Sequence, residues 1–244
     1  MDSGDSLDLG MYSGSRAVGR RALAQGHGAG QGALVLPDGH SGPYVLWGKR
    51  LFDVVAAALS LASAFVLMAI IAAIISLDGG KPFFAHTRIG RNGQKFKCLK
   101  FRTMVSDSEA RLQRLLREDP DAAAEWAADF KLRNDPRVTR LGLFLRKSSL
   151  DELPQLWNVI RGDMSLVGPR PVTEPEIALY GKDATAYYSV RPGITGLWQV
   201  SGRNEVSFQE RVDLDREYTQ ELSLWQDIRI LVRTVTVVLR VTGC

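Results

Sequence analysis

A run of 24 consecutive residues without a charged side chain, residues 54–77, constrains this chain more than any other feature. A straight helix of that length spans ~36 Å at ~1.5 Å per residue, which exceeds the ~30 Å hydrocarbon core of a bilayer. Buried helices of soluble proteins usually carry shorter apolar runs, of ~10–14 residues. The sequence therefore predicts a membrane-inserted helix within residues 45–80, with a buried core helix as the alternative.

The flanks of this run bear on how such a helix enters the membrane. Lys49 and Arg50 precede it, and seven basic residues but no acidic residue lie within residues 81–102. Because basic flanks favour the cytoplasmic side, a re-entrant helix that returns to the same leaflet satisfies both ends. The run has no proline or glycine to force a bend, although the hydroxyls of Ser60 and Ser63 can bond back to the backbone and ease a kink. A straight span is the alternative.

The remaining composition is close to that of globular proteins, apart from the first 44 residues. Ten of the 23 glycines fall in residues 1–43, with few large apolar side chains, so residues 1–44 are predicted to form a disordered tail. The net charge of +4 fits nucleic acid, an anionic membrane or phosphorylated substrates and does not choose among them. Cys98 and Cys244 lack metal-ligand spacing and are predicted to be free thiols.

Local patterns predict a mostly helical α/β fold with one small β-hairpin. The turn of the hairpin is predicted at Arg91-Asn92-Gly93-Gln94, between β-leaning segments in residues 83–103. Helices are predicted from a capping box at 106–109 to about residue 116, and over 121–131 and 208–222, with a short helix or turn at 138–146. Residues 225–241 form a basic amphipathic pattern, which indicates either an interfacial membrane helix or an ordinary helix packed on the core.

Adjacent carboxylates at Asp151 and Glu152 make the chemically richest segment. One interpretation is structural: with Ser149 they match a capping box, and acids in a first helical turn are favoured by the helix dipole. The other is phosphoryl transfer, in which an ionised Asp attacks a phosphoanhydride and a neighbouring Glu holds Mg²⁺. Arg146 and Arg170 flank the pair and supply the cations that such a reaction needs.

Several motifs together resemble the bacterial sugar transferases, the monotopic phosphoglycosyl transferases that begin lipid-linked glycan assembly. The matching segments are KRLFD (49–53), RIGRNGQKFKCLKFRTM (88–104), RLGLFLRKSSLDELPQLWNVIRGDMSLVGPRP (140–171), RPGITGLWQVSGR (191–203) and LDREYTQELSLWQDIRIL (214–231). Five motifs in the same order are highly specific, and the resemblance covers about residues 45–244. The chain is most similar to the short exopolysaccharide-type members, which lack the four extra N-terminal membrane helices of larger members.

The resemblance implies an activity and a location. Members transfer a sugar-1-phosphate from a UDP-sugar to undecaprenyl phosphate and release UMP through a phosphosugar-aspartate intermediate, in the first membrane step of exopolysaccharide synthesis. Galactose is the expected sugar, with glucose as the alternative. Residues 81–244 would form a catalytic domain with a C-terminal interfacial helix, on the cytoplasmic face of the bacterial inner membrane. Membrane lipid is an expected partner and nucleic acid is not; a homodimer is an open alternative.

The resemblance also assigns roles to individual residues. It implies that Asp151 is the nucleophile and that Glu152 binds Mg²⁺. Arg146 and Arg170 correspond to the family's phosphate-binding arginines. Four further residues are placed at the substrate site by their motifs: Lys100, Arg102, Arg191, which contacts the nucleotide or braces the fold, and Asp215, which helps to shape the active site.

Two departures and two rival functions accompany this interpretation. Many members break the membrane helix at a Ser-Pro pair, whereas no proline occurs within residues 54–77, and LDGGKPFF (77–84) replaces a Ser-Pro-Gly-Pro segment. Trp198 is expected in the core rather than against a base, and Gly193 and Gly196 are expected in tight turns. A non-catalytic scaffold of the polysaccharide machinery is the main alternative function, and a basic nucleic-acid-binding protein is the second.

Overall fold

The computed structural model describes residues 42–129, 132, 134–202 and 206–239. The chain divides into two units, Met1–Leu34 and Val35–Cys244, and every described residue belongs to the second unit. Nearly all of the predicted tail at residues 1–44 therefore lies outside the described residues, as does Cys244. Cys98 is a buried free thiol, which confirms that part of the cysteine prediction.

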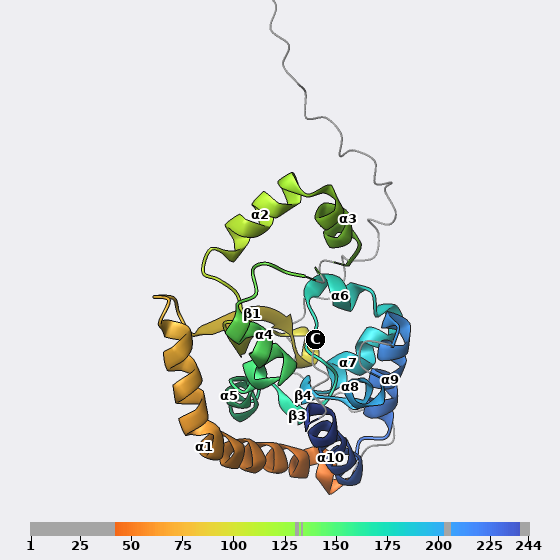
Figure 1. Ribbon diagram of the computed structural model, residues 1–244. Helices are drawn as coiled ribbons and strands as arrows, with labels where there is room; N and C mark the ends of the chain where they lie inside the picture. The colour runs from red at the N-terminus through yellow and green to blue at the C-terminus, as the bar shows by residue number, and fades with distance from the viewer. Residues whose placement is uncertain (1–41, 130–131, 133, 203–205, 240–244) are drawn as a thin grey trace, which may run out of the picture. The chain divides into compact units, whose positions relative to one another are not determined.

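The described part of the chain is mostly helical with two small sheets, which agrees with the predicted α/β class (Figure 1). The helices are α1 (Lys49–Ser76), α2 (Ser108–Glu118), α3 (Pro120–Asp129), α4 (Arg140–Lys147), α5 (Gln155–Arg161), α6 (Glu174–Ala178), α7 (Ala184–Ser189), α8 (Leu197–Ser201), α9 (Phe208–Gln220) and α10 (Leu224–Leu239). The strands are β1 (Phe83–Ile89), β2 (Lys95–Phe101), β3 (Ser165–Val167) and β4 (Gly193–Thr195).

The predicted hairpin is confirmed. β1 and β2 pair antiparallel, with Phe84 opposite Lys100 and Ile89 opposite Lys95. The turn between them places Asn92 at φ 57° and Gly93 at φ 72°, the left-handed backbone that tight hairpin turns require. The hairpin therefore follows from its turn residues.

A second sheet joins two sequence motifs that are far apart. β3 and β4 pair parallel, with Ser165 opposite Gly193. A Cβ atom on Gly193 would lie 2.2 Å from the backbone nitrogen of Gly168, so only glycine allows this approach. The prediction of a tight turn at Gly193 is wrong, because the residue lies in a strand and its small size serves close packing. Strands of three residues show no alternation from which to predict them.

Helix α1 lies largely on the surface of the described unit. Residues 44–76 are the one described helical segment that is long and apolar enough to cross a membrane, and 11% of its most apolar window is buried. Leu59, Phe65 and Val66 are each about two thirds exposed, at 68%, 65% and 67%. A core helix buries its apolar side chains, so this exposure does not fit the core-helix alternative.

Helix α1 is bent near its middle, so that its two halves run in different directions (Figure 1). The hydroxyl of Ser63 donates to the carbonyl oxygen of Ser60 at 2.9 Å, and such back-bonding by serine bends helices. In the second half of α1, Ile71 and Ile75 are buried against Phe101 of β2. The bend therefore brings the far half of the helix back onto the unit that holds the first half.

The first turn of α1 is anchored by a buried ionic cluster. Lys49 Nζ lies 2.7 Å from Asp227 Oδ2 of α10 and donates to the carbonyl of Val167 in β3 at 3.1 Å. The hydroxyl of Tyr218 lies 2.8 Å from the other oxygen of Asp227. Asp53 accepts a bond from the backbone N–H of Leu166 at 3.1 Å. The KRLFD motif thus ties α1 to β3 and α10.

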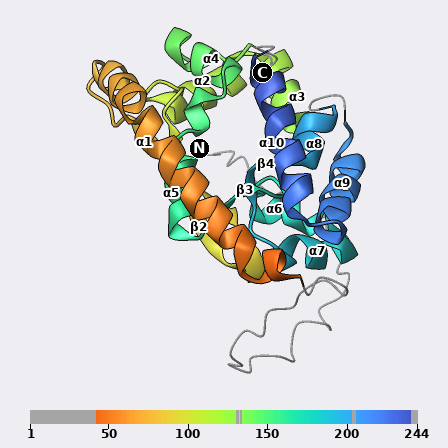
Figure 2. The same ribbon diagram turned by 90° about the horizontal axis from the view of Figure 1, so that it is seen from below.

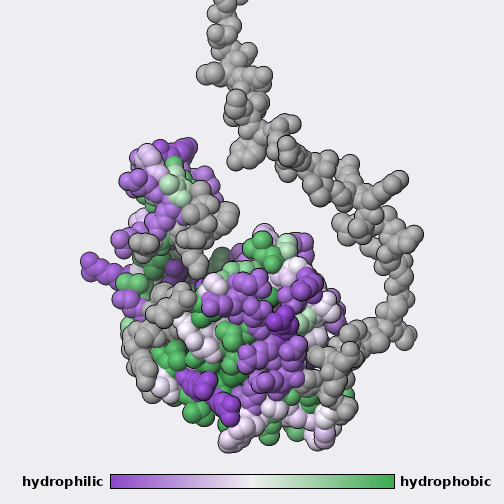
Figure 3. Space-filling model, turned by 90° about the vertical axis from the view of Figure 1, so that its right-hand side faces the viewer, coloured by the Kyte–Doolittle hydropathy of each residue, from purple (hydrophilic) through white to green (hydrophobic). Residues whose placement is uncertain are grey.

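The C-terminal helices pack beside the second sheet, which lies between α1 and α10 when viewed from below (Figure 2). Helix α10 buries Asp227 and Ile230, whereas Trp225, Val232 and Val235 are exposed. Of the apolar stripe predicted along this helix, Leu231 is partly buried against the core, whereas Val232 and Val235 are exposed. Trp198 is 7% exposed, which confirms its predicted core position. The side that carries α7 and α9 has a mixed, mostly hydrophilic surface (Figure 3).

Candidate active site

Asp151 and Glu152 lie in a sharp corner between α4 and α5. Ser149 adopts a left-handed backbone at φ 57°, and a single 3-10 turn follows at Leu150–Glu152. Helix α5 starts only after Pro154, and Ser149 makes no side-chain cap bond. The predicted capping box at this position is therefore wrong, because the left-handed residue turns the chain before a helix can begin. A non-glycine residue held in this conformation is typical of functional sites.

Lysine and arginine side chains surround the carboxylate pair. Lys100 Nζ of β2 lies 2.6 Å from Glu152 Oε1 and 3.5 Å from Asp151 Oδ2. Arg170 Nη1 lies 3.9 Å from the same Glu152 oxygen. Asp151 is 7% exposed, whereas the side chain of Arg170 is 45% exposed. The site therefore has a buried carboxylate at its base and a cation open to an incoming anion.

A hydrogen bond to Thr103 holds the side chain of Arg146 in place. Its Nε donates to Thr103 Oγ1 at 2.9 Å, and Thr103 lies just beyond β2. The backbone N–H of Thr139, the N-cap of α4, donates to the carbonyl oxygen of Thr103 at 3.0 Å. A Cβ on Gly142 would lie 2.0 Å from that oxygen, so glycine is needed for α4 to pack on this segment. Sequence reasoning missed Thr103, whose role depends on contacts between distant segments.

The electrostatic state of Asp151 reflects opposing effects. Burial raises its pKa, and the neighbouring Glu152 carboxylate adds to the rise. The charges of Lys100 and Arg146 act in the opposite direction, and the pKa stays above its ordinary value. A carboxylate that is poorly hydrated yet ionised is a stronger nucleophile than one in bulk water, and the surrounding cations limit the cost of ionising it.

Arg88 joins the site through the register of the hairpin. Residues alternate faces along β1, and Arg88 shares a face with Phe84, which lies opposite Lys100. Arg88 Nη1 lies 3.2 Å from Glu176 Oε2. Burial lowers the pKa of Arg88, the charge of Glu176 opposes this, and the positive charge of Arg170 adds to the lowering. The sequence marked Arg88 only as part of a basic flank. The period-2 alternation with Lys100 is the signal that could have found it.

Arg102 braces the end of α1 instead of facing the carboxylate pair. Its guanidinium bonds to the carboxylate of Asp78, with one contact at 2.8 Å, and to the carbonyl of Ile75 at 3.0 Å. Its Nε donates to the carbonyl of Lys81 at 2.8 Å. The structure thus differs from the predicted substrate contact, because these acceptors at the end of α1 engage the guanidinium.

Arg191 and Asp215 also lie apart from the carboxylate pair. Arg191 Nε donates to the carbonyl of Gly162 at the end of α5, at 2.8 Å, which agrees with the bracing alternative. Asp215 Oδ2 accepts from the hydroxyl of Tyr180 at 2.9 Å, while Oδ1 is buried and has no hydrogen-bond partner. Burial raises the pKa of Asp215 to about 7. Through Tyr180, Asp215 therefore supports the segment between α6 and α7, and none of its hydrogen bonds involves Asp151.

The carboxylate corner rests on the second half of α1. Leu150 and Leu153, on either side of the pair, pack against a cluster that contains Ile71 and Ile75 of α1. The neighbouring α4 exposes Phe144, which is 59% exposed. The site thus lies where the long apolar helix returns to the polar part of the unit.

The carboxylate pair has the donor set that Mg²⁺ uses. Mg²⁺ is usually held by one or two carboxylates together with substrate phosphate oxygens. The side chain of Glu152 is 19% exposed and that of Asp151 is 10% exposed, so both reach the surface of the site. No group of three or more His, Cys, Asp or Glu side chains lies together in the described ranges. The two carboxylates therefore fit a Mg²⁺ ion that arrives with a phosphorylated substrate.

Comparison with known proteins identifies the family of this chain. The family described as bacterial sugar transferase matches residues 44–241. The chain is 55% identical over 195 residues to the UDP-galactose-lipid carrier transferase of Erwinia amylovora, and 51% identical over 195 residues to the undecaprenyl-phosphate galactose phosphotransferase of Salmonella typhimurium. These matches cover 80% of this chain and 41% of each relative.

A third relative is matched over most of its length. The chain is 53% identical over 191 residues to the exopolysaccharide production protein ExoY of Rhizobium meliloti, which covers 78% of this chain and 84% of that protein. The matched segments contain the carboxylate pair and the cations around it. The chain belongs to the bacterial sugar transferase family.

Proposed function

We propose that this protein transfers a hexose-1-phosphate from a UDP-sugar to undecaprenyl phosphate, with release of UMP. The observation that carries the proposal is the buried Asp151 carboxylate beside Glu152, with Lys100 3.5 Å away and Arg170 at the open side. The names of the relatives support UDP-galactose as the donor, with UDP-glucose as the alternative. The reaction would be the first membrane step of exopolysaccharide synthesis.

The first half-reaction uses the carboxylate as a nucleophile. An Asp151 oxygen attacks the phosphorus that bears the sugar, and the bond from that phosphorus to the bridging oxygen breaks, so that UMP leaves with the electron pair. Arg146 and Arg170 offset the negative charge that spreads over the transferring phosphoryl group. The ammonium charge of Lys100 lowers the pKa of the Asp151 carboxyl, which opposes the effect of burial and favours the ionised form.

The second half-reaction regenerates the enzyme. An oxygen of undecaprenyl phosphate attacks the same phosphorus, the bond to Asp151 breaks, and the product is a lipid diphosphate sugar. Two steps at one nucleophile give ping-pong kinetics. The contact of Leu150 and Leu153 with α1 supports this step, since it holds the site at the level where an acceptor phosphate would lie.

Glu152 would hold Mg²⁺ at this site. The ion would neutralise charge on the phosphates of the donor and help to orient them. Lys100 Nζ lies 2.6 Å from Glu152 Oε1, so the lysine occupies part of the coordination space and must share the carboxylate with the metal. The residues present nevertheless supply the oxygen donors that Mg²⁺ prefers.

We further propose that α1 is re-entrant and that the catalytic unit lies on the cytoplasmic face of the inner membrane. Support comes from its two ends, which contact the same unit: Lys49 bonds to Asp227, and Ile75 packs on Phe101. A straight helix of 28 residues would separate its ends by ~42 Å. Exposed apolar side chains on α1 and α10 would lie in the membrane and at its surface, respectively.

The test of the reaction is UMP release from a panel of UDP-sugars. Detergent-solubilised protein is incubated with Mg²⁺, undecaprenyl phosphate and each donor, and UMP is quantified. We expect rapid release with one sugar, which would identify the donor. Asp151→Asn should abolish release, whereas Asp213→Asn, which changes an exposed carboxylate on α9, should retain it.

A companion measurement detects the intermediate. Without the acceptor, the wild-type protein should gain the mass of a hexose phosphate on the peptide that contains Asp151. Folded protein that releases no UMP with any sugar would instead support the scaffold alternative. Full activity of Asp151→Asn would refute the nucleophile assignment.

A further inference from the structure

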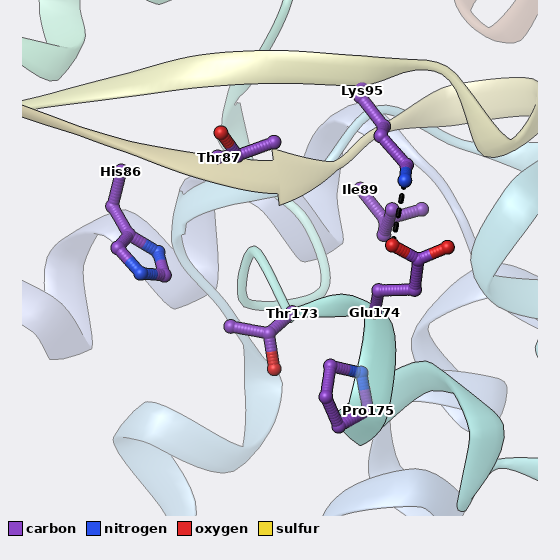
Figure 4. A pocket seen from close by; sticks show the side chains of 7 residues that line it. All are labelled: His86, Thr87, Ile89, Lys95, Thr173, Glu174 and Pro175. Atoms are coloured by element: carbon purple, nitrogen blue, oxygen red, sulfur yellow. Dashed lines mark hydrogen bonds and ion pairs between the residues drawn. The ribbon is translucent and has the colours of Figure 1, made fainter.

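A recess lies along the free edge of β1, away from the carboxylate pair (Figure 4). Its volume is about 340 Å³, and it is lined by His86, Thr87, Ile89 and Lys95 of the hairpin and by residues 173–175. Lys95 and Glu174 form an ion pair of 2.6 Å at one end, and His86 lies at the other (Figure 4). The recess thus combines an apolar floor with polar groups at both ends, as small-molecule pockets do.

This recess is connected to the carboxylate pair by a row of cations. Lys100, which contacts the pair, lies opposite Phe84 at the start of β1. The β1 residues of the recess, from His86 to Ile89, lie two to five positions farther along, which is ~7–17 Å at ~3.3 Å per residue. Arg88 shares a strand face with Phe84 and Lys100, lies beside the recess four positions beyond Phe84, and is held by Glu176. A diphosphate followed by a nucleoside would meet Lys100 first and would reach Arg88 and the recess together.

The position of the recess on the hairpin also indicates that the donor and the acceptor reach the site from opposite ends. The start of the hairpin adjoins α1, because Phe83 stacks on Phe101 at 5.3 Å and Phe101 packs against Ile71 and Ile75. The recess lies toward the other end of the hairpin, at Ile89 and Lys95. A lipid acceptor would reach the site from the side of α1. The opposite end of the hairpin is therefore open to the water-soluble part of the donor.

The backbone of β1 offers hydrogen bonds that suit a pyrimidine. Ile89 N–H donates to the carbonyl of Val172 at 2.9 Å, on the side away from β2. In an antiparallel pair the outward groups recur at every second residue, so the N–H and C=O of Thr87 also point away from β2. Uracil carries an N–H flanked by carbonyl oxygens and can bond to such a donor and acceptor. Carboxylate oxygens of Glu174 can accept from ribose hydroxyls.

We infer that this recess binds the uridine of the donor, with the base along the edge of β1 at Thr87 and the ribose toward Glu174. The assignment rests on the proposed function and adds a specificity site to it. It places the leaving UMP between Arg88 and the recess, while the sugar phosphate stays at Asp151.

The test fills the recess and measures UMP binding. Full-length protein in detergent is titrated with UMP by calorimetry, and the KM for the UDP-sugar is measured. Thr87→Phe should weaken UMP binding and raise the donor KM by about tenfold or more, with kcat and the KM for undecaprenyl phosphate unchanged. Ala85→Phe is the matched control, since Ala85 is exposed on the same face of β1 but outside the recess, and it should behave as wild type.

A second measurement does not depend on the fold of a variant. Irradiation of the wild-type protein with 4-thio-UMP should crosslink residues 83–95 or 172–176, as mapped by mass spectrometry. Crosslinks elsewhere, or wild-type UMP affinity in Thr87→Phe, would overturn the assignment.

The two proposals fail in different ways. If the wild-type protein turns over a UDP-sugar but Thr87→Phe has an unchanged donor KM, the uridine site is wrong and the reaction stands. If UMP binds and crosslinks at the recess but no UDP-sugar is turned over, the site stands and the reaction is wrong.

Discussion

Arg146 Nε donates a hydrogen bond of 2.9 Å to Thr103 Oγ1, across 43 residues of sequence. Thr103 is 7% exposed, so this hydroxyl acts as a buried support for a cation beside Asp151. Thr103→Val keeps the shape but leaves the guanidinium without this acceptor, which typically costs ~1–3 kcal/mol. We expect kcat/KM for the donor to fall about tenfold.

Thr103→Ser provides the control for a positioning role, because it keeps the hydroxyl and should restore most of the activity. Steady-state kinetics of the two variants, with melting temperatures, test this. Equal loss in both variants would indicate that the methyl group matters and not the bond to Arg146.

Lys100 should set the acid limb of the pH–rate profile. Asp151 must be ionised to attack, so activity is lost as the pH falls through its pKa. The charge of Lys100 lowers that pKa, so Lys100→Met should raise it and move the acid limb of kcat/KM to higher pH. Lys147→Met, at an exposed position of α4, should leave the limb in place. An unshifted limb in Lys100→Met would contradict this electrostatic role.

The ion pair between Lys49 and Asp227 should be a large contributor to the stability of the folded unit. Asp227 is fully buried, and its oxygen lies 2.7 Å from Lys49 Nζ. Asp227→Asn leaves Lys49 with only its 4.0 Å contact to Asp53, and breaking a buried pair costs ~3–5 kcal/mol. Thermal unfolding in detergent should show the loss. The triple variant Lys49→Met/Asp53→Asn/Asp227→Asn, which removes all three charges and keeps an acceptor at position 227, should recover much of it; no recovery would point to packing instead.

Asp215 should make stability depend on pH. Burial raises its pKa from 3.8 to about 7, so between these values the folded state binds a proton that the unfolded state releases. The contribution of this group to stability is therefore greatest at low pH and is lost as the pH rises toward 7, by ~4 kcal/mol at most.

Asp215→Asn cannot ionise and still accepts the bond from Tyr180. The melting temperature of this variant relative to wild type should therefore increase between pH 5 and pH 8. Differential scanning calorimetry at several pH values measures the difference, and a constant difference across this range would show that Asp215 does not titrate there.

The two ends of α1 should be accessible from the same side of the membrane. Cysteines placed at Gly42 and Lys81, both exposed, report on the flanks. The variants carry Cys244→Ser, so that Cys98 is the one remaining native cysteine. Cys98 is buried, and burial raises the pKa of its thiol, which suppresses its reaction with maleimide. A membrane-impermeant maleimide should label both positions in inverted vesicles and neither in intact spheroplasts. Labelling of the two positions from opposite sides would show a straight span.

The sequence could indicate Asp151, Glu152, Arg146 and Arg170 because they lie close together in the chain, in motifs with recognisable spacing. The structure brings these four together with Lys100. Their proximity in sequence limits how far a folded chain can separate them, so local reasoning was sufficient.

Other basic residues could not be sorted in the same way. Arg102 and Arg191 carry the same charge as Arg146 and occupy equally specific motifs, yet they bond to the end of α1 and the end of α5. Arg88 reaches the site only through the pairing of β1 with β2. The partner of a long, flexible cationic side chain depends on which acceptors the fold places within its reach. The residues next to it in the sequence do not determine those acceptors.

Capping motifs show the same distinction. The Ser-Glu patterns at Ser106 and Ser149 do not form caps, whereas Thr173 and Ser207 do, each with a glutamate three residues later. Ser149 lies in a corner where α4 has just ended, and its left-handed backbone prevents the cap geometry. The pattern is a local preference that tertiary packing can override.

The sequence by itself determined the long apolar helix, the hairpin with its Asn-Gly turn and the adjacent carboxylates, because each depends on the order of residues within a short segment. Only the tertiary structure decided that α1 bends back onto the unit through Ile71 and Ile75, that Gly193 serves close packing, and that Thr103 supports Arg146. The physical reason is the separation along the chain. The length of an apolar run and the preference for a turn depend on residues adjacent in sequence, whereas a buried ion pair or hydrogen bond needs two distant segments that only folding brings together.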